Sequence, residues 1–430
     1  MIKIIKLLIG GSPCTHWSIA QKKNRETTAS GIGWELFKNY LYAKERFKPD
    51  LFLYENNKSA SQPIKDQISE ELGVDLMYIN SALVSAQHRQ RFYAFNWNVE
   101  QPQDRGILLK DIIESGLPWT DKAYCLTASY NGAVVSNTLE RKQRTMIAEP
   151  VNPLKCGKAR CLTAGYANKG VSHILEINCS PNPSKQQWDS IAIPVKKPNK
   201  PQYVGEIPGH KTQYQNGKQA SQQCRIYSID GKSIACDTSF HKNVALPVDR
   251  EKKFAVGIKW NKDGEPTEAV SGTGDKRYPV YKVCNGITFL KGKSYPIALD
   301  DGYYIIRKLT VKECCRLQTL PDDYCKAVSK TQAYKGLGNG WTAEVIIHIL
   351  LGALKNVDRN EKIVVLSMYD GIGTGRYCLD KMGFKNVEYY AFEIDKFAMR
   401  VANDNYPDII QCGDAFQMRD NTFNINGLLR

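Results

Sequence analysis

The chain has 430 residues, 42% of them hydrophobic, and its 59 Lys and Arg against 44 Asp and Glu give a formal net charge of +15. This length predicts two or three lobes, and the hydrophobic content excludes a disordered chain. The positive charge favours an anionic partner, such as nucleic acid or an anionic membrane surface. A solvated basic surface without a partner is the plain alternative.

The first 120 residues alternate strand and helix signals. The apolar start is broken by Lys3 and Lys6, so we interpret it as a buried strand and not as a signal peptide. Strands are expected at Leu7–Ile9, Leu51–Tyr54, Met77–Asn80 and Arg91–Phe95, and helices at Gly33–Phe47 and Gln62–Leu72. This alternation predicts βαβ units and a parallel sheet.

Residues 121–302 differ in composition, with frequent Pro, Gly, Asn and Lys. This composition predicts a small, irregular β-rich domain. Within 121–300 there are 27 Lys and Arg against 15 Asp and Glu, so +12 of the net charge lies there. Hairpin turns are expected at Asn131-Gly132, Asp230-Gly231 and Asn285-Gly286. Cys125–Tyr130 and Cys161–Tyr166 share the run Cys-Leu-Thr-Ala, from which we infer no repeat architecture.

Clear helix and strand patterns reappear from about residue 303. Helices are expected at Thr310–Leu317, Thr342–Leu354 and Tyr377–Met382, strands at Ile363–Met368 and Glu388–Ile394, a linker at Lys355–Lys362 and a glycine-rich turn at Gly371–Gly375. The last of these elements form the opening unit of a nucleotide-binding α/β domain.

The 13 cysteines are odd in number and include no Cys-x-x-Cys pair. Cys156 and Cys161 lack a matching second pair, so no zinc site is expected. Reduced thiols in a cytoplasmic protein are the simpler account. No stretch approaches the ~20 apolar residues that span a bilayer, and we expect no membrane insertion.

The glycine-rich turn follows a buried strand and lets the backbone approach a ligand closely. Glu393, at the end of the next strand, can accept hydrogen bonds from ribose hydroxyls, and Asp414 follows the third strand at the same sheet edge. A purely structural turn is the alternative reading.

Cys14 follows Pro13 at the end of the first buried strand. For a lone Pro-Cys pair a buried structural cysteine is the plainer reading. If the strands are parallel, however, Glu55, Arg89 and Arg91 meet this thiol at one edge of the sheet. The arginines would then lower the thiol pKa from about 8.5 and favour the thiolate. Ordinary surface charges are the alternative.

The order of these motifs resembles the DNA cytosine-5 methyltransferase family. The motifs are Pro13-Cys14, Glu55-Asn56, Gln87-x-Arg89-x-Arg91, the segment Arg307–Asp322 and Gly338-Asn339, followed by Tyr369–Gly375, Glu393 and Asp414, which resemble the methyl-donor site. The resemblance implies a Rossmann-like, S-adenosylmethionine-dependent methyltransferase fold. That fold has a mixed, mostly parallel sheet with helices on both faces, and residues 121–302 would form a target-recognition domain.

The motif order departs from the family, in which the methyl-donor motifs come first. Here they follow Gly338-Asn339, so the chain is expected to be circularly permuted, with Lys355–Lys362 joining the usual ends. The tail Asp420–Arg430 is expected to lead back toward Leu7–Ile9. Ser367 stands where many members carry Asp, and Asn57 stands where Val is common.

The resemblance also implies catalytic roles. Cys14 would add covalently to C6 of cytosine and so activate C5. Glu55 would act as a general acid at N3. Arg91 would steady the cytosine and the catalytic groups, and Arg89 would hold Glu55 or a phosphate.

The remaining implied residues form the donor site for S-adenosylmethionine. Tyr369 would pack on the adenine, Glu393 would contact the ribose, Asp414 the adenine amino group, and Asn339 would lie near the pocket. Asp370, Gly371, Gly373, Gly375 and Ile394 complete the predicted set. No metal is expected, because the sulfonium already carries the leaving group.

Double-stranded DNA is the expected partner, and the target base must be flipped out of the helix. Residues 16–31 are interpreted as a mobile loop that closes over this base, and the basic domain as a clamp on the phosphates. A tRNA cytosine-5 methyltransferase is an alternative that leaves the large basic domain unexplained. A catalytically dead DNA-binding module is another, although Cys14 and Glu55 are both present. We expect a monomer in a bacterial or phage-infected cytoplasm; a partner restriction endonuclease, an orphan enzyme and phage self-protection stay open.

Overall fold

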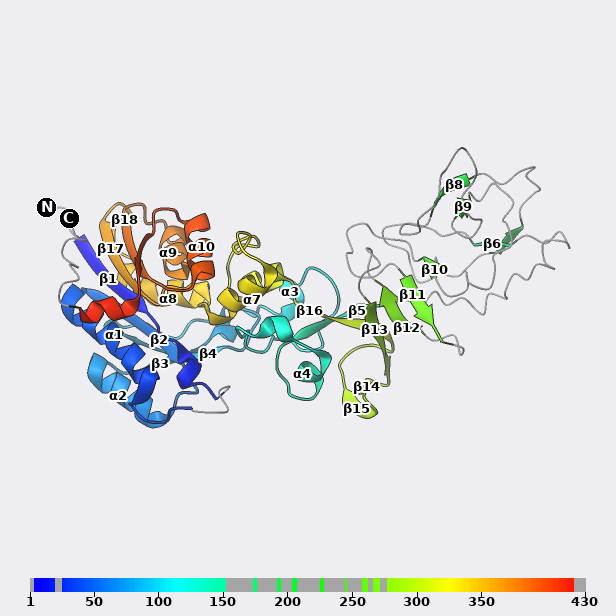
Figure 1. Ribbon diagram of the computed structural model, residues 1–430, viewed down its shortest axis with the longest axis horizontal. Helices are drawn as coiled ribbons and strands as arrows, with labels where there is room; N and C mark the ends of the chain where they lie inside the picture. The colour runs from blue at the N-terminus through cyan, green and yellow to red at the C-terminus, as the bar shows by residue number, and fades with distance from the viewer. Residues whose placement is uncertain are drawn as a thin grey trace. The chain divides into compact units, whose positions relative to one another are not determined.

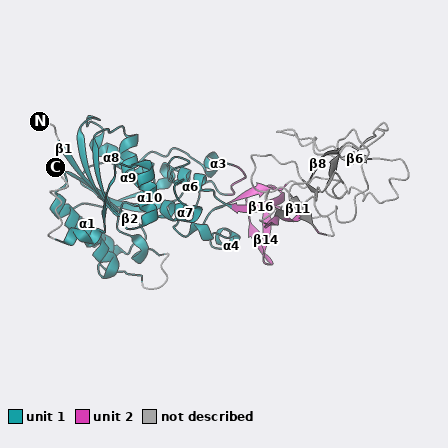
Figure 2. Cartoon of the chain, turned by 45° about the horizontal axis from the view of Figure 1, so that its top comes forward, with its two compact units in different colours: residues 1–114, 120–146, 308–430 teal, residues 115–119, 147–307 magenta. Residues whose placement is uncertain are grey.

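A computed structural model describes residues 4–19, 25–151, 257–261, 266–270 and 277–420, with the backbone of five short strands between 173 and 245. The chain divides into two compact units (Figure 2). Unit 1 comprises residues 1–114, 120–146 and 308–430, and unit 2 comprises residues 115–119 and 147–307. Residues 121–146, which were expected in the middle domain, thus belong to unit 1.

Unit 1 is built on a seven-stranded sheet of order β19-β18-β17-β1-β2-β4-β3 (Figure 1). Its strands are β1 (Ile4–Gly10), β2 (Leu51–Asn57), β3 (Met77–Asn80), β4 (Gln90–Phe95), β17 (Lys362–Met368), β18 (Val387–Phe392) and β19 (Ile410–Gly413). All the strands predicted outside the middle domain are present near their expected bounds. The mixed α/β class is confirmed.

The centre of the sheet joins the two ends of the chain. β1 pairs in parallel with β17 from Ile4↔Lys362 to Gly10↔Met368, and in parallel with β2 on its other side. β18 and β19 extend the sheet beyond β17, again in parallel. The carboxyl ends of these five strands therefore lie at one edge, where α/β sheets bind their ligands.

The sheet is mixed and mostly parallel, as expected, but the parallel pairing expected among the strands of the first 120 residues fails at β4, which runs antiparallel to both β2 and β3. β3 and β4 are joined by residues 81–89, which contain only the short 3-10 turn η2 (Ser81–Leu83). A parallel pair needs a crossover of about a dozen residues or more, so this short connection permits only an antiparallel one. Because β4 is reversed, it begins at the edge where β2 ends.

Helices cover both faces of the sheet (Figure 1). The core on one face contains Leu8, Tyr54 and Leu366, which pack with residues of α1 (Gly31–Phe47) and α2 (Gln62–Leu72). Side chains of successive strand residues point to opposite faces. Leu7 and Ile9, which are fully buried, accordingly face the side of α9 (Thr374–Lys381), where Ile9 lies against Gly375.

Four described helices of unit 1 were not predicted, namely the short α3 (Leu109–Ile112) and α4 (Val135–Leu139) and the longer α7 (Lys330–Asn339) and α10 (Lys396–Asn405). α7 is followed closely by α8 (Ala343–Leu354), and residues 330–354 together are long and apolar enough to cross a membrane. The helical conformation is interrupted at residues 340–342, however, and 56% of the apolar window is buried inside the fold. The pair therefore serves as core helices.

The described part of unit 2 is rich in antiparallel strands. β13 (Arg277–Cys284) and β14 (Ile287–Leu290) form the hairpin predicted at Asn285-Gly286, where φ is 51° and 69°. Both angles are positive, as a tight hairpin turn requires. Asp230-Gly231 and Cys161–Tyr166 lie outside the described residues.

The hairpin predicted at Asn131-Gly132 is wrong. These residues belong to a 3-10 turn in unit 1, η3 (Tyr130–Gly132). Tyr130 is buried, and its hydroxyl donates to the Thr145 carbonyl and accepts from the Leu309 amide. This anchoring of Tyr130 overrides the local preference of Asn-Gly for a hairpin.

We predict that Gly375→Ala destabilises unit 1 by about 1–3 kcal/mol. An added Cβ would lie 2.4 Å from Ile9 Cδ1 and 2.5 Å from the Tyr389 hydroxyl, both on fully buried side chains. This overlap outweighs the gain of about 1 kcal/mol that alanine brings to a helix. The free energy of unfolding in urea checks the prediction. Gly132→Ala is the control, because its nearest neighbour would be Arg144 at 3.7 Å.

Candidate active site

A cavity of about 420 Å³ lies in unit 1 at the edge where the parallel strands end. Its lining includes most of the predicted site residues, namely Cys14, Glu55, Arg89, Arg91, Asn339, Tyr369, Asp370, Gly371, Glu393, Ile394 and Asp414. Residues from the first hundred and from the last seventy positions of the chain therefore share one space.

Gly373 and Gly375 are the two predicted residues that do not line this cavity. Gly373 precedes α9 with φ of 77°, and a Cβ there would lie 3.1 Å from Ala402 of α10. Gly375 allows α9 to approach Ile9 and Tyr389. Both glycines permit close packing behind the turn, whereas Gly371 is at the cavity itself.

The loop that carries Cys14 is tied to β2. Cys14 begins the short 3-10 turn η1 (Cys14–His16), and the backbone amide of Trp17 donates to its carbonyl at 3.1 Å. Asn56 is 1% exposed, and its Nδ2 donates to the Ser12 carbonyl at 2.9 Å. The side chain of Asn56 thus holds the loop two residues before the thiol, a role that the sequence did not assign.

Each carboxylate oxygen of Glu55 has a partner, one in an ion pair and the other in a hydrogen bond. Arg91 Nε lies 2.9 Å from Oε1, and the side chains of this ion pair are 10% and 12% exposed. Trp341 Nε1 donates to Oε2 at 3.0 Å. Trp341 was not predicted, and the only sequence signal for it was its place two residues after Asn339.

Burial raises the pKa of the Cys14 thiol above its ordinary value. Arg91 and Arg89 lower this pKa and Glu55 raises it, but burial has the largest effect. The expectation that the arginines make Cys14 a thiolate is therefore wrong for the chain alone. Here the free-energy cost of desolvating a thiolate is larger than the stabilisation of that thiolate by Arg91 and Arg89.

Arg89 does not contact Glu55. It is 3% exposed, and its guanidinium donates to three backbone carbonyls, Leu126 at 3.0 Å, Gly338 at 3.2 Å and Gly340 at 2.7 Å. These bonds join the segment after residue 125 to the Gly338-Asn339 motif. The expectation that Arg89 holds Glu55 is wrong, and its burial leaves little surface for a phosphate.

The glycine-rich turn is bonded to its neighbours. Tyr369 has φ of 59°, and its hydroxyl donates to the Leu36 carbonyl at 2.8 Å. The Gly371 amide donates to Glu393 Oε2 at 2.9 Å. Ile394 lines the cavity with 73% of its surface exposed, which gives this end of the site an open apolar side chain.

Asp370 is a buried carboxyl in the wall of the cavity. Ser367 Oγ and the Tyr389 hydroxyl both donate to its Oδ1, at 2.7 Å and 2.6 Å. Burial raises the pKa of Asp370 to about 6. Its Oδ2 and Thr374 Oγ1 have no hydrogen-bond partner among the residues that the structure describes. Ser367, noted as a departure from the family, thus faces a carboxylate three positions later.

The expected mobile loop at residues 16–31 is fixed at both described ends. Trp17 is fully buried, and its Nε1 donates to Glu26 Oε2 at 3.1 Å. Glu26 also accepts from the Gly33 amide, and Arg25 Nη2 donates to the Ser59 carbonyl. Residues 20–24 lie outside the described part of the chain.

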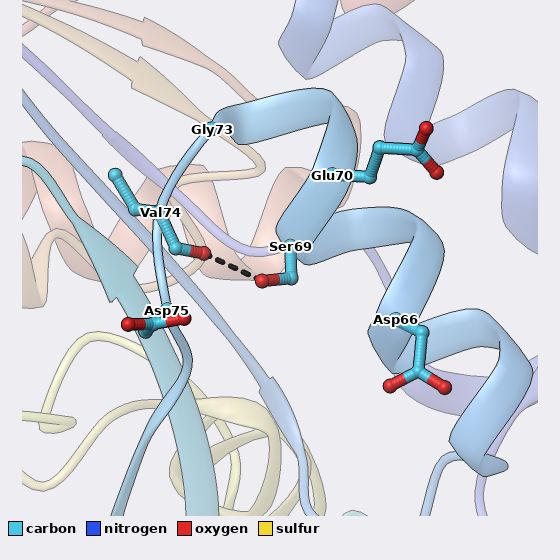
Figure 3. Close-up of a pocket in the computed structure, with 6 residues that line it drawn as sticks. All are labelled: Asp66, Ser69, Glu70, Gly73, Val74 and Asp75. Carbon is cyan, nitrogen blue, oxygen red and sulfur yellow. Dashed lines mark hydrogen bonds between the residues drawn. The ribbon is translucent and has the colours of Figure 1, made fainter.

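A second hollow lies on the surface at the end of α2 (Figure 3). Asp66, Ser69, Glu70, Gly73, Val74 and Asp75 line it. The Ser69 hydroxyl already donates to the Val74 carbonyl at 2.7 Å. Its three carboxylates would repel an anionic ligand such as a phosphate, and none of the predicted site residues lines it.

Comparison with known proteins gives two matches. A family model of C-5 cytosine-specific DNA methylases matches residues 1–354. The orphan methyltransferase M.SPRI of Bacillus phage SPR is 23% identical over 380 residues, which cover 79% of this chain and 80% of the relative. The family match contains Cys14, Glu55 and Arg91 and ends before the glycine-rich turn.

We predict that Asp370→Asn stabilises the protein more at pH 8 than at pH 5. The folded-state pKa of Asp370 is raised to about 6 from 3.8, so its contribution to stability is full below about pH 4 and is lost as the pH rises through 6. The asparagine side chain at position 370 carries no charge at any pH. The free energy of unfolding of the variant relative to wild type should therefore be larger at pH 8 than at pH 5 by about 1.4 kcal/mol.

Urea unfolding at pH 5 and pH 8 measures this difference. Asp104→Asn, at an exposed aspartate away from the cavity, serves as the control. A difference for Asp370→Asn that is the same at both pH values would contradict the assignment of a buried, titrating carboxyl.

Proposed function

The chain belongs to the family of C-5 cytosine-specific DNA methylases and is a DNA cytosine methyltransferase; on this premise we propose that it methylates C5 of a flipped-out cytosine in duplex DNA through a covalent Cys14–C6 adduct. S-adenosylmethionine is the proposed methyl donor. The observation that carries the proposal is the single cavity shared by Cys14, Glu55, Arg91 and the glycine-rich turn.

The donor site has the chemistry that S-adenosylmethionine requires. The unpartnered Oδ2 of Asp370 and Oγ1 of Thr374 are buried polar atoms that a cationic, hydrogen-bonding ligand would satisfy. Glu393 and Asp414 can accept hydrogen bonds from the ribose and the adenine, and Tyr369 and Ile394 supply apolar surface. When bound, the donor presents an electrophilic methyl group on a positively charged sulfur.

The proposed chemistry begins at Cys14. C5 of cytosine is a poor nucleophile, and addition of a thiolate to C6 moves the ring electrons toward C5 and N3. Glu55 delivers a proton to N3, which prevents negative charge from accumulating there. After methylation, the C5 proton leaves to water, the Sγ–C6 bond breaks and N3 returns its proton to Glu55, which restores the aromatic ring and frees Cys14.

The pKa of Cys14 links these steps. Burial raises it, and the Glu55 carboxylate raises it further. When Glu55 is protonated for its role at N3, one negative charge beside the thiol disappears. Arg91 then favours the thiolate without opposition from Glu55. We propose that cytosine binding activates Cys14 in this way, so that the resting enzyme keeps an unreactive thiol.

We assign the DNA contacts to the part of the chain that carries most of the positive charge. The excess of +12 in residues 121–300 suits a duplex whose backbone carries a regular negative charge. We propose that this region grips phosphates and reads bases, and that residues 16–31 approach the flipped base. The relative from Bacillus phage SPR is described as an orphan methyltransferase, so we propose no restriction endonuclease as a partner. A cytoplasmic location follows from this substrate.

We also propose that the chain is circularly permuted relative to the usual motif order. The residues of the donor site, apart from Asn339, lie beyond position 354, where the family match ends. β17 nevertheless pairs with β1 along its whole length, so the last strands complete the sheet that the first strands begin. Residues 355–361, between α8 and β17, would be the connection that replaces the usual chain ends.

We predict that Cys14→Ser abolishes methyl transfer, because a serine hydroxyl is a far weaker nucleophile toward C6 than a thiolate. Transfer of tritium-labelled methyl groups to duplex DNA and to tRNA measures the activity, and bisulfite sequencing of DNA from expressing cells identifies the site. Cys325→Ala, at a buried cysteine outside residues 121–300 that does not line the cavity, is the control and should retain full activity. Full transfer to DNA by Cys14→Ser would remove Cys14 from the mechanism.

A further inference from the structure

Cys125 opens the Cys-Leu-Thr-Ala segment, to which the proposed mechanism gives no role. Its sulfur accepts hydrogen bonds from Arg89 Nη1 at 3.4 Å and from Arg91 Nη2 at 4.0 Å. The same two arginines line the cavity beside Cys14, whereas Cys125 is not part of its lining. In the described structure, two thiols thus lie near one arginine pair, and only Cys14 lines the cavity.

Arg91 is held through all three of its guanidinium nitrogens. Nε pairs with Glu55 Oε1 at 2.9 Å, Nη1 donates to the Gln90 carbonyl at 2.9 Å, and Nη2 faces Cys125 Sγ. A guanidinium is planar, so fixing its two Nη groups sets the direction in which Nε points. Cys125 is thus a side-chain partner of the Arg91 guanidinium in addition to Glu55.

The backbone around Cys125 is fixed, so the sulfur is a firm anchor. The Leu126 amide donates to Gln87 Oε1 at 3.2 Å, and the Leu126 carbonyl accepts from Arg89. The next residue packs closely on Gly338, where an added Cβ would lie 2.2 Å from the Thr127 carbonyl carbon. Cys125 therefore cannot drift away from the arginines.

The charges agree with this geometry. Burial raises the pKa of Cys125, but Arg89 and Arg91 lower it by more, so the net pKa is below the ordinary value. Burial lowers the pKa of Arg91, and Cys125 is first among the groups that raise it again. Cys14 differs, because burial outweighs the arginines there. Of the two thiols, Cys125 thus has the stronger tendency to form a thiolate and to pair with the arginines.

We propose that Cys125 is a positioning residue for methyl transfer, whose sulfur orients Arg91 so that Nε holds Glu55 and the guanidinium charge stays beside Cys14. The proposal rests on the proposed function of Cys14 and Glu55. It gives the Cys-Leu-Thr-Ala segment a role in catalysis without contact with the substrate.

Three variants test this role. Cys125→Val keeps the volume but offers no acceptor, Cys125→Ser keeps an acceptor, and Cys325→Val alters a buried thiol that does not line the cavity. We expect Cys125→Val to lower kcat by about 10²-fold, the effect of a small misplacement of a catalytic group, with the KM for S-adenosylmethionine unchanged. Serine should restore most of the rate, and Cys325→Val should match wild type.

A second readout needs no methylation activity. The rate at which iodoacetamide alkylates Cys14 is followed against pH by mass spectrometry of its peptide. In Cys125→Val the charge of Arg91 is no longer held beside Cys14, so the midpoint of alkylation should move to higher pH; Cys125→Ser should move it back. If the valine variant does not fold, Cys125→Ala replaces it.

The outcomes separate the two proposals. A folded Cys125→Val protein with unchanged kcat and an unchanged Cys14 alkylation profile would overturn the positioning role. A wild-type protein that transfers no methyl group to DNA, but whose Cys14 profile moves in Cys125→Val, would refute the proposed function and support the positioning of Arg91 by Cys125.

Discussion

The parallel pairing of β1 with β17 is the constraint on which the site depends. It places Gly10 opposite Met368, so the Cys14 loop and the Tyr369 turn leave the sheet side by side. The contact leaves no room for a side chain at Gly10, because a Cβ there would lie 2.5 Å from the Met368 carbonyl oxygen. Segments more than 350 positions apart thus line one cavity, and the chemistry proposed here needs that proximity more than any single contact.

Around this edge, a buried guanidinium balances several acidic groups. Arg91 pairs with Glu55, faces Cys125 and lowers the pKa of Cys14, while burial acts against every charge in the cluster. A buried charge is tolerated only when it is paired and hydrogen-bonded. The charge state of Cys14 therefore depends on its neighbours, and a change at Glu55 or Arg91 is felt at the thiol. In the proposed mechanism, the raised pKa of Cys14 favours an unreactive thiol until those surroundings change.

Much of this arrangement could be predicted from local patterns. The apolar strands and the residues that end them placed Cys14, Glu55 and Glu393 at one edge, because parallel strands share their carboxyl ends. The direction of β4 was missed, since it depends on the length of a connection. The contacts of Asn56, Trp341 and Cys125 were missed for another reason. Trp341 and Glu55 are 286 positions apart, and no periodicity in the sequence reveals which distant side chain completes a hydrogen bond.

The most direct test of the shared cavity is a covalent trap. Duplex DNA in which every cytosine is 5-fluorocytosine is incubated with the wild-type protein and S-adenosylmethionine, and the protein–DNA adduct is digested and sequenced by mass spectrometry. Fluorine at C5 cannot leave as a proton does, so the reaction stops after methylation with the enzyme still attached. The account predicts one adduct, formed only with the donor present, on the peptide that carries Cys14. An adduct on another cysteine, or none with DNA that the enzyme methylates when unsubstituted, would contradict it.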